Sequence, residues 1–295
     1  MNVEPAAQET SGSYRHIEVR GMTAALGAEV SGVDLSRQLD QSVLAEIRQA
    51  LLDHLVIYFR DQALSETQLA DFGRQFGELE VEPFIRASKD EPGVHVTKGF
   101  HPDRPHGRTL NWHMDHTYLE VPTWGIVLQG VDVPQAGNDT LFANTYLSYE
   151  ALAPQMQVFL SGLTAIHDIC QYSLDSGILN IDTEEGIEEL AIMRKQFPKV
   201  EHPLVCTHPE TGRKMIYFNP AWVIGIKGFS REESHVVVSF LKQHMVKPIF
   251  QCRIRWQNNT IAFWDNRCLI HSPVPDYMGK RLMQRVAIGG DWRPS

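Results

Sequence analysis

The segment NWHMDHTYLEVP, residues 111–122, holds two histidines and an aspartate close together, at His113, Asp115 and His116. Imidazole nitrogens and carboxylate oxygens are frequent ligands of transition metals. In an extended segment, side chains two positions apart point the same way, so His113 and Asp115 could reach one ion while His116 points to the other face. Two ligands hold an ion weakly, and we therefore expect a third ligand from a distant part of the chain.

His271 has the surroundings that best suit this third position. It follows the apolar run NTIAFWD and a polar turn, and it precedes the Pro-rich stretch SPVPDYMGK. A histidine at the end of a buried strand is more often structural than metal-bound, so both interpretations stay open at this point. Two histidines and one carboxylate on one side of an ion, with open positions opposite, are typical of non-haem Fe(II) oxygenases. A three-ligand zinc site, which could be hydrolytic, is the competing interpretation.

The strand predicted at RLMQRVAIGG, residues 281–290, carries two arginines on one face. Because side chains alternate along a strand, Arg281, Met283, Arg285 and Ala287 point the same way. If that face is buried, both guanidinium groups need anionic partners, since an unpaired buried charge costs several kcal/mol. The alternative is an exposed edge strand with two solvated arginines.

The composition fits a globular enzyme and excludes some partners. The 295 residues are 43% hydrophobic and 21% charged, with a formal net charge of −9 that disfavours nucleic acid. No apolar run reaches the ~20 residues that a membrane span needs. Four widely spaced cysteines indicate free thiols in a reducing compartment, so we expect a cytoplasmic protein.

The elements that must position these side chains are mostly short strands. Strands between Gly, Pro and Asn turns predict a mainly β fold, a jelly roll with flanking helices. Helices are predicted near 42–54, after Ser65 where Gln68 completes a capping box, and near 230–245. We expect a disordered tail at 1–14, one domain over 15–295, a lid-like loop at about 80–110 and a helical insertion at about 171–200.

Five pieces of the sequence together resemble the taurine and 2,4-dichlorophenoxyacetate dioxygenase family of Fe(II)/2-oxoglutarate enzymes. They are WHMD at 112–115, NDT at 138–140, FWDNR at 263–267, His271, and RLMQR at 281–285. The resemblance implies a double-stranded β-helix, an Fe(II) cofactor, 2-oxoglutarate as co-substrate, and O2. It implies iron ligation by His113, Asp115 and His271, and co-substrate binding by Thr140 and Arg281. Arg285 would bind an acidic group of the substrate, and Trp222 would lie against it.

The implied reaction couples decarboxylation of 2-oxoglutarate, which gives succinate and CO2, to hydroxylation of a small organic substrate. If the hydroxylated carbon bears a heteroatom, the product collapses with cleavage of a C–O or C–S bond. Desaturation or oxidative decarboxylation of an amino-acid-like substrate is the alternative outcome. A non-catalytic protein that binds small acids is a further alternative, which the complete ligand set disfavours. The family commonly forms dimers and tetramers, so we also expect a homo-oligomer.

Charge indicates the kind of substrate. Fe(II), ionised Asp115, doubly anionic 2-oxoglutarate and Arg281 together are neutral, which leaves Arg285 for an anionic or zwitterionic substrate. The alternative is an internal partner such as Glu80, Glu82 or Asp276. Taurine-specific members carry a histidine after GEL, whereas this chain has GELEVEP, with Glu82 at that position. We therefore expect Glu82 and Asn111 to contact a substrate other than taurine.

Overall fold

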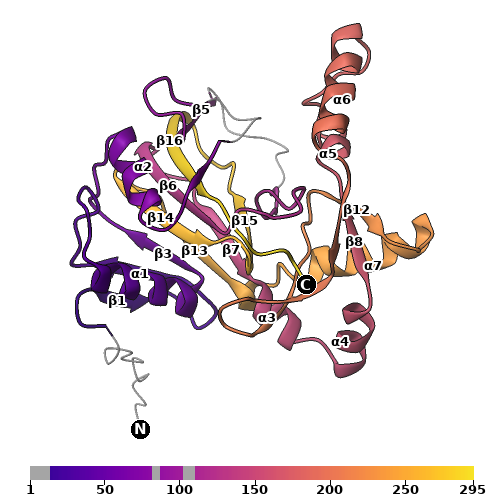
Figure 1. Ribbon diagram of the computed structural model, residues 1–295, viewed down its shortest axis with the longest axis horizontal. Coiled ribbons are helices and arrows are strands. Elements are labelled where there is room, and N and C mark those ends of the chain that lie inside the picture. The colour runs from indigo at the N-terminus through magenta and orange to yellow at the C-terminus, as the bar shows by residue number, and fades with distance from the viewer. Residues whose placement is uncertain (1–13, 82–86, 102–109) are drawn as a thin grey trace.

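The computed structural model describes residues 14–81, 87–101 and 110–295 (Figure 1). A large, mostly antiparallel sheet lies at its centre. In spatial order it contains β1 (Glu18–Gly21), β2 (Ala28–Ser31), β3 (Val56–Phe59), β14 (Thr260–Asp265), β6 (Gly125–Asp132), β16 (Gly279–Ile288) and β4 (Leu79–Glu80), and β5 (His95–His101) also pairs with β16. A smaller sheet contains β13 (Gln251–Ile254), β7 (Thr140–Asn144) and β15 (Leu269–Pro273). This arrangement agrees with the predicted jelly roll.

The remaining elements lie outside these two sheets. One further sheet contains β12 (Val223–Ile226), β8 (Thr164–His167) and β9 (Val200–Pro203), and β10 (Val205–Thr207) pairs with β11 (Lys214–Ile216). The helices are α1 (Gln41–His54), α2 (Glu66–Arg74), α3 (Thr145–Glu150), α4 (Pro154–Ser161), α5 (Ile169–Asp175), α6 (Glu184–Gln196), α7 (Arg231–His244) and the short η1 (Pro248–Phe250). No helix in the described part of the chain is long and apolar enough to cross a membrane.

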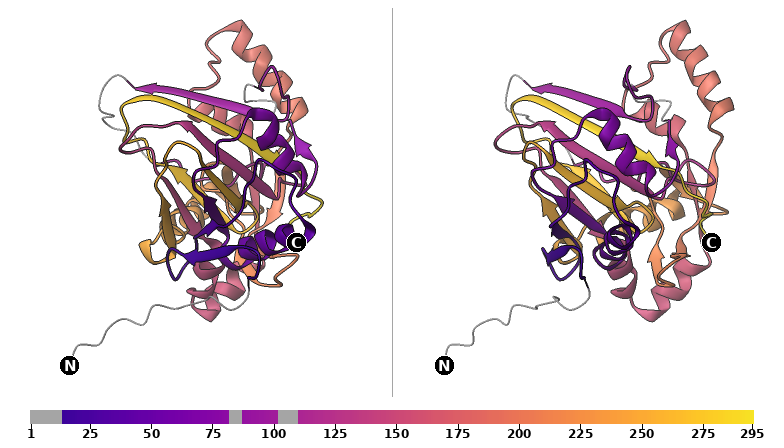
Figure 2. Two further views of the ribbon diagram at one scale, coloured as in Figure 1. Left: turned by 90° about the vertical axis from the view of Figure 1, so that its left-hand side faces the viewer. Right: turned by 60° about the vertical axis from the view of Figure 1, so that its left-hand side comes forward.

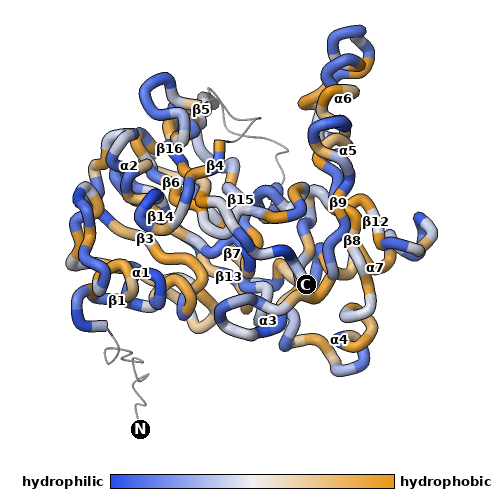
Figure 3. Tube along the Cα trace, in the orientation of Figure 1, coloured by the Kyte–Doolittle hydropathy of each residue, from blue (hydrophilic) through white to orange (hydrophobic). Residues whose placement is uncertain are grey.

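The central strands are buried on both faces because each face packs against a different layer. Side chains on the inner face of the large sheet pack against the small sheet; they include Val56, Ala262, Trp264, Met283 and Ala287. Side chains on its other face pack against α1 and α2; they include Ile57, Phe59, Ile261, Phe263 and Val286. Figure 3 shows hydrophobic residues along the central strands and hydrophilic ones in the outer loops.

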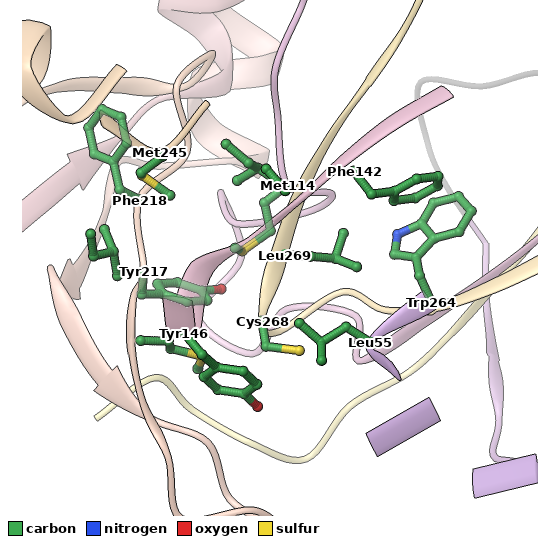
Figure 4. Packing of buried hydrophobic residues seen from close by; sticks show 14 of the residues in the cluster. Leu55, Met114, Phe142, Tyr146, Tyr217, Phe218, Met245, Trp264, Cys268 and Leu269 are labelled. Carbon is green, nitrogen blue, oxygen red and sulfur yellow. The ribbon is translucent and has the colours of Figure 1, made fainter. Parts of the chain in front are cut away.

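The inner core brings aromatic rings close to the candidate metal ligands. The rings of Phe142 and Trp264 lie 5.4 Å apart (Figure 4). Both residues also contact the His271 ring. Fully burying a side chain of this size contributes about 1.5–3 kcal/mol to folding. The same packing therefore holds the fold together and fixes the His271 ring.

Several elements begin and end where the sequence indicates. Ser65 caps α2 and exchanges both hydrogen bonds of a capping box with Gln68. Ser230 and Glu233 form the same box at the start of α7. The four cysteines are free and buried.

The sequence of residues 146–162 favours one helical stretch, but the structure has two helices there, because Pro154 cannot continue α3 and instead begins α4. Within the loop predicted at about 80–110, the sequence VHVTK at 94–98 favours a short strand, and there β5 pairs with β16 over seven residue positions and His95 is fully buried. The predicted tail at 1–14 falls outside the described residues except for its last position.

Candidate active site

His113, Asp115 and His271 come together although His271 is far away in the chain. His113 and His271 form an isolated antiparallel bridge, in which each backbone N–H donates to the other residue's carbonyl (2.9 and 2.8 Å). Nε2 of His113 lies 3.9 Å from Oδ1 of Asp115, and Nε2 of His271 lies 3.5 Å from Oδ2 of Asp115. The three ligand atoms are within 4.8 Å of one another, a separation that a single ion can bridge.

The protonation of the donors suits a metal ion. Nδ1 of His113 lies 2.8 Å from the carbonyl oxygen of Asn111. Because a carbonyl can only accept, this nitrogen carries the proton and leaves the Nε2 lone pair for an ion. Burial is the largest cause that lowers the pKa of His271 to about 3, so its imidazole is neutral at physiological pH. Two neutral imidazoles and a carboxylate form the ligand set of non-haem Fe(II) sites.

Asp115 supplies the negative charge of the site. Burial alone would raise its pKa, but the charge of the Arg285 guanidinium, 3.4 Å away, lowers it below the usual range. Oδ2 of Asp115 is buried and has no hydrogen-bond partner among the described residues. A buried carboxylate oxygen without a donor is costly unless a cation occupies the space beside it.

Two asparagines fix the backbone of the ligand segment. The Asp115 N–H donates to Oδ1 of Asn266 (3.0 Å), and Nδ2 of Asn266 donates to the carbonyls of Asp115 (2.8 Å) and Thr123 (2.9 Å). Nδ2 of Asn219 donates to the carbonyl of Met114 (2.6 Å). Sequence analysis missed both residues as site components, although Asn266 lies inside the FWDNR motif.

A second group of potential ligands, His208, Asp265 and Cys268, does not suit a metal ion. Nδ1 of His208 accepts from the backbone N–H of Glu210 (3.3 Å), so Nε2 carries the proton that it donates to Asp265 (3.1 Å). Arg267 donates to both oxygens of Asp265 (2.8 and 2.6 Å). Burial raises the pKa of the Cys268 thiol, which keeps it protonated. We interpret this group as a structural ion-pair network.

The predicted co-substrate residues lie on strands next to the triad. Arg281 is on the same face of β16 as Met283 and Ala287, which belong to the inner core, so this face points inward as one of the two predictions required. Nε of Arg281 is buried and has no hydrogen-bond partner in the part of the chain that the structure describes. Thr140 begins β7, two residues before Phe142, which pairs with His271. Its hydroxyl accepts from Nε1 of Trp256 (2.9 Å).

A cavity of about 490 Å³ opens beside the triad and contains three of the four predicted substrate residues: Asn111, Trp222 and Arg285. The fourth, Glu82, lies outside the described residues. Arg285 and Asp115 form the charged part of the cavity. The apolar part comes from Ile169, Leu179, Met193 and Trp222, which pack together as a small cluster.

Sequence analysis missed this apolar wall. It consists of α5, α6 and the turn between them, which project from the body of the molecule in Figure 1 and in both views of Figure 2. The segment had been predicted as an acidic helical insertion without a role. Met193 lines the cavity and Leu190 packs in the same cluster, so the helical spacing of these buried residues was the available signal.

A larger cleft of about 800 Å³ lies elsewhere and is lined by residues that include Arg48, Trp124, Glu210 and Arg267. It includes none of His113, Asp115 and His271. Arg48 and Arg267 both stack on the Trp124 ring, and Glu210 pairs with both guanidinium groups. Because these charges are already paired, we place the chemistry in the smaller cavity.

The jelly roll and this donor set define the class of Fe(II)- and 2-oxoglutarate-dependent oxygenases. Residues 18–287 match the family described as "Taurine catabolism dioxygenase TauD, TfdA family". The chain belongs to this family, and it is an oxidoreductase that uses 2-oxoglutarate, O2 and Fe(II). The resemblance seen in the sequence motifs is thereby confirmed.

Individual relatives are similar over most of their length. An alkylsulfatase of Acinetobacter baylyi is 31% identical over 94% of this chain and 86% of the relative. An alpha-ketoglutarate-dependent sulfate ester dioxygenase of Pseudomonas putida is 30% identical over 97% and 94%. The crystal structure of a taurine dioxygenase from Burkholderia xenovorans is 33% identical and superposes with a TM-score of 0.79, covering 95% of this chain and 91% of that one.

Proposed function

We propose that this enzyme oxidises small organic anions with an apolar body, and that sulfate esters of aliphatic alcohols are its substrates. The observation that carries the proposal is one cavity beside the ligand triad, lined by His113 and Asp115, a guanidinium group and an apolar wall. In this proposal His113, Asp115 and His271 hold Fe(II), while Thr140 and Arg281 bind 2-oxoglutarate. When bound, the iron would activate O2 at the expense of 2-oxoglutarate, with release of succinate and CO2.

The charges of the cavity support an anionic substrate. Once Asp115 ligates a divalent ion, its charge is shared with that ion, and the Arg285 guanidinium at the cavity can bind a second anion beside it. A guanidinium group binds a planar or tetrahedral oxyanion through two parallel hydrogen bonds. Glu189 also lines the cavity but is exposed, so solvent screens its charge. Asn111, whose Nδ2 donates to the Tyr172 hydroxyl (3.0 Å), would orient the substrate near His113.

The apolar wall supports an alkyl body rather than a compact substrate such as taurine. Trp222 packs against Tyr118 with ring centroids 5.1 Å apart, and its ring lies 6.3 Å from that of His113. An alkyl chain held along this wall would place the carbon that bears the sulfate beside the metal site. The two relatives whose names describe sulfate ester cleavage support this choice.

The proposed reaction is a hydroxylation followed by breakdown of the hydroxylated product. One oxygen atom of O2 enters the carbon that bears the sulfate, and the other enters succinate. The hydroxylated carbon then loses its hydroxyl proton, the C–O bond to sulfate breaks, and the products are an aldehyde and sulfate. The protein contributes orientation through Arg285 and Trp222, and it limits water access at Asp115 and His271, which are buried.

A substrate comparison tests the proposal. Purified Fe(II) enzyme is given 2-oxoglutarate and either a medium-chain alkyl sulfate, the corresponding alcohol, the corresponding alkylamine or taurine. We expect succinate and sulfate in equal amounts with the alkyl sulfate, and much less succinate with the others. Equal turnover of the neutral alcohol would refute the anion requirement. Sulfate release without O2 would instead indicate a hydrolase.

We also propose a homo-oligomer, a dimer or tetramer, in a cytoplasmic location. The projecting α5–α6 segment exposes Ile178, Ile181, Ile187 and Ile192, each at about half or more of its surface. Exposed apolar side chains grouped on one segment favour contact with another protein surface. Free thiols at all four cysteines support a reducing compartment. Light scattering of the wild-type protein and of an Ile187→Ser, Ile192→Ser variant would test the oligomer.

A further inference from the structure

Tyr277 is buried next to the arginine proposed to bind 2-oxoglutarate. It lies between β15 and β16 with 7% of its surface exposed, four residues before Arg281. Arg281 stands directly opposite Gly99 of β5, and the two strands run side by side in both views of Figure 2. Tyr277, Arg281 and Gly99 therefore meet at one place in the large sheet.

The contact at Gly99 shows where the tyrosine hydroxyl points. A Cβ at position 99 would be 2.5 Å from Oη of Tyr277 and 3.7 Å from Cβ of Arg281. The hydroxyl thus occupies the space that a side chain on β5 would fill, beside the base of the arginine side chain. Gly99 is absent from the glycines with positive φ, so space rather than backbone conformation favours glycine here.

Arg281 has few partners for a buried cation. Its Nε has no hydrogen-bond partner among the described residues. Burial lowers the pKa of its guanidinium group, and Tyr277 acts in the opposite direction by raising it. A buried guanidinium group with an N–H that lacks an acceptor is stabilised when a carboxylate binds. The two charges then pair, and the N–H gains an acceptor.

We propose that Tyr277 is a second binding residue for the distal carboxylate of 2-oxoglutarate. Its hydroxyl donates a hydrogen bond to the carboxylate that Arg281 pairs with, and Gly99 leaves the space that this hydroxyl needs. The inference rests on the proposed role of Arg281. The proposed role explains why the Tyr277 hydroxyl, the Nε–H of Arg281 and Gly99 lie together in the sheet.

Ligand titration of the Tyr277→Phe variant tests this role. Fe(II)-loaded protein is titrated without O2 with 2-oxoglutarate, and the absorbance of the iron–keto acid chelate reports binding. The variant should bind 2-oxoglutarate about tenfold more weakly, because one hydrogen bond to a charged group is lost. Pyruvate, which chelates in the same way but lacks the distal carboxylate, should bind both proteins equally.

Gly99→Ala supplies an independent variant. The added methyl group would displace the Tyr277 hydroxyl and weaken 2-oxoglutarate binding by a similar factor. In the Tyr277→Phe background the same change should have little further effect, because the nearest remaining atoms are 3.7 Å from the new Cβ. Such non-additivity is the sign of two residues that act through one contact.

The outcomes separate this inference from the proposed function. Unchanged 2-oxoglutarate affinity in Tyr277→Phe would overturn the inference, as would an equal loss for pyruvate, which would indicate an effect on the metal site or the fold. Thermal unfolding of the metal-free variants checks that they fold. If wild-type protein fails to bind 2-oxoglutarate at all, the proposed function fails instead.

Discussion

Asp115 is held by different groups at its backbone and its side chain. Asn266 bonds to its backbone N–H and carbonyl, Arg285 lies beside one carboxylate oxygen, and His271 lies beside the other. The backbone contacts fix the position of the Asp115 main chain, and the charge of Arg285 keeps the carboxylate ionised. A ligand fixed in this way loses little conformational freedom when an ion binds, which favours binding.

Replacing Asn266 with alanine should weaken the metal site without removing a ligand. The variant loses three hydrogen bonds to the ligand segment, so we expect Fe(II) affinity to fall by about 10- to 100-fold. Metal affinity is measured by the rise in the unfolding temperature with added Fe(II) under anaerobic conditions. Asn258→Ala, at an exposed asparagine that accepts from the Val133 N–H, is the control. Equal metal affinity in the two variants would contradict the positioning role.

Replacing Arg285 with glutamine should affect the substrate more than the co-substrate. The variant keeps hydrogen-bond donors but loses the charge, so we expect KM for an alkyl sulfate to rise about tenfold or more. The affinity for 2-oxoglutarate should change little, since that role falls to Arg281. Arg37→Gln, on an exposed arginine, provides the comparison. A tenfold loss of 2-oxoglutarate affinity in Arg285→Gln would contradict this assignment and would indicate that Arg285, rather than Arg281, binds the co-substrate.

At the scale of elements, the site combines rigid and projecting parts. The triad and both arginines lie on or beside paired strands, whereas the apolar wall comes from α5 and α6. α2 supports the rigid part, because its residues Leu69 and Phe72 pack on the outer face of the large sheet. The capping box at Ser65 fixes where this helix begins.

Replacing Ser65 with alanine should therefore lower the free energy of unfolding by about 1 kcal/mol. The N-cap hydroxyl that accepts from the Gln68 N–H is lost, and that donor is left without its partner. Urea denaturation of the metal-free protein measures the change. Ser239→Ala, within α7, should not destabilise, since alanine has the higher helix propensity. Equal stability of Ser65→Ala and the wild type would show that the cap contributes nothing.

At the scale of the whole molecule, several buried histidines make stability depend on pH. Burial lowers the pKa of His167, His202 and His244 below the ordinary 6.5. The unfolded chain then binds more protons than the native state as pH falls through 6.5, so stability decreases toward acid. Above that pH all three are neutral in both states and the effect disappears.

We expect the free energy of unfolding of the metal-free protein to fall between about pH 7 and about pH 5.5, before most carboxylates titrate. Urea denaturation across this range measures it. His167→Asn, which removes a fully buried imidazole, should show a shallower dependence than the exposed control His235→Asn. A dependence of the same steepness in both variants would contradict the assignment to His167.

The parts of the site that could be predicted from the sequence are those whose residues lie close together in the chain. His113 and Asp115 are neighbours, and the spacing of Arg281 and Arg285 follows from strand alternation alone. His271 needed the family resemblance, because nothing local distinguishes it from a core histidine. The role of Tyr277 could not be predicted, since it depends on which strand packs beside it. For α6 the apolar spacing indicated a buried face, but not that this face lines the cavity. The break at Pro154 was predictable in principle, because proline rarely continues a helix.

The bridge between His113 and His271 has a consequence for iron supply. Two backbone hydrogen bonds fasten these residues to each other, and neither bond involves a metal ligand atom. Unlike a zinc finger, which unfolds when chelated, this protein should keep its shape after its iron is removed and become active again when ferrous salt returns. A cell short of iron could therefore store the enzyme intact and switch it on without new synthesis. Circular dichroism after chelator treatment, followed by recovery of succinate production, would show this directly.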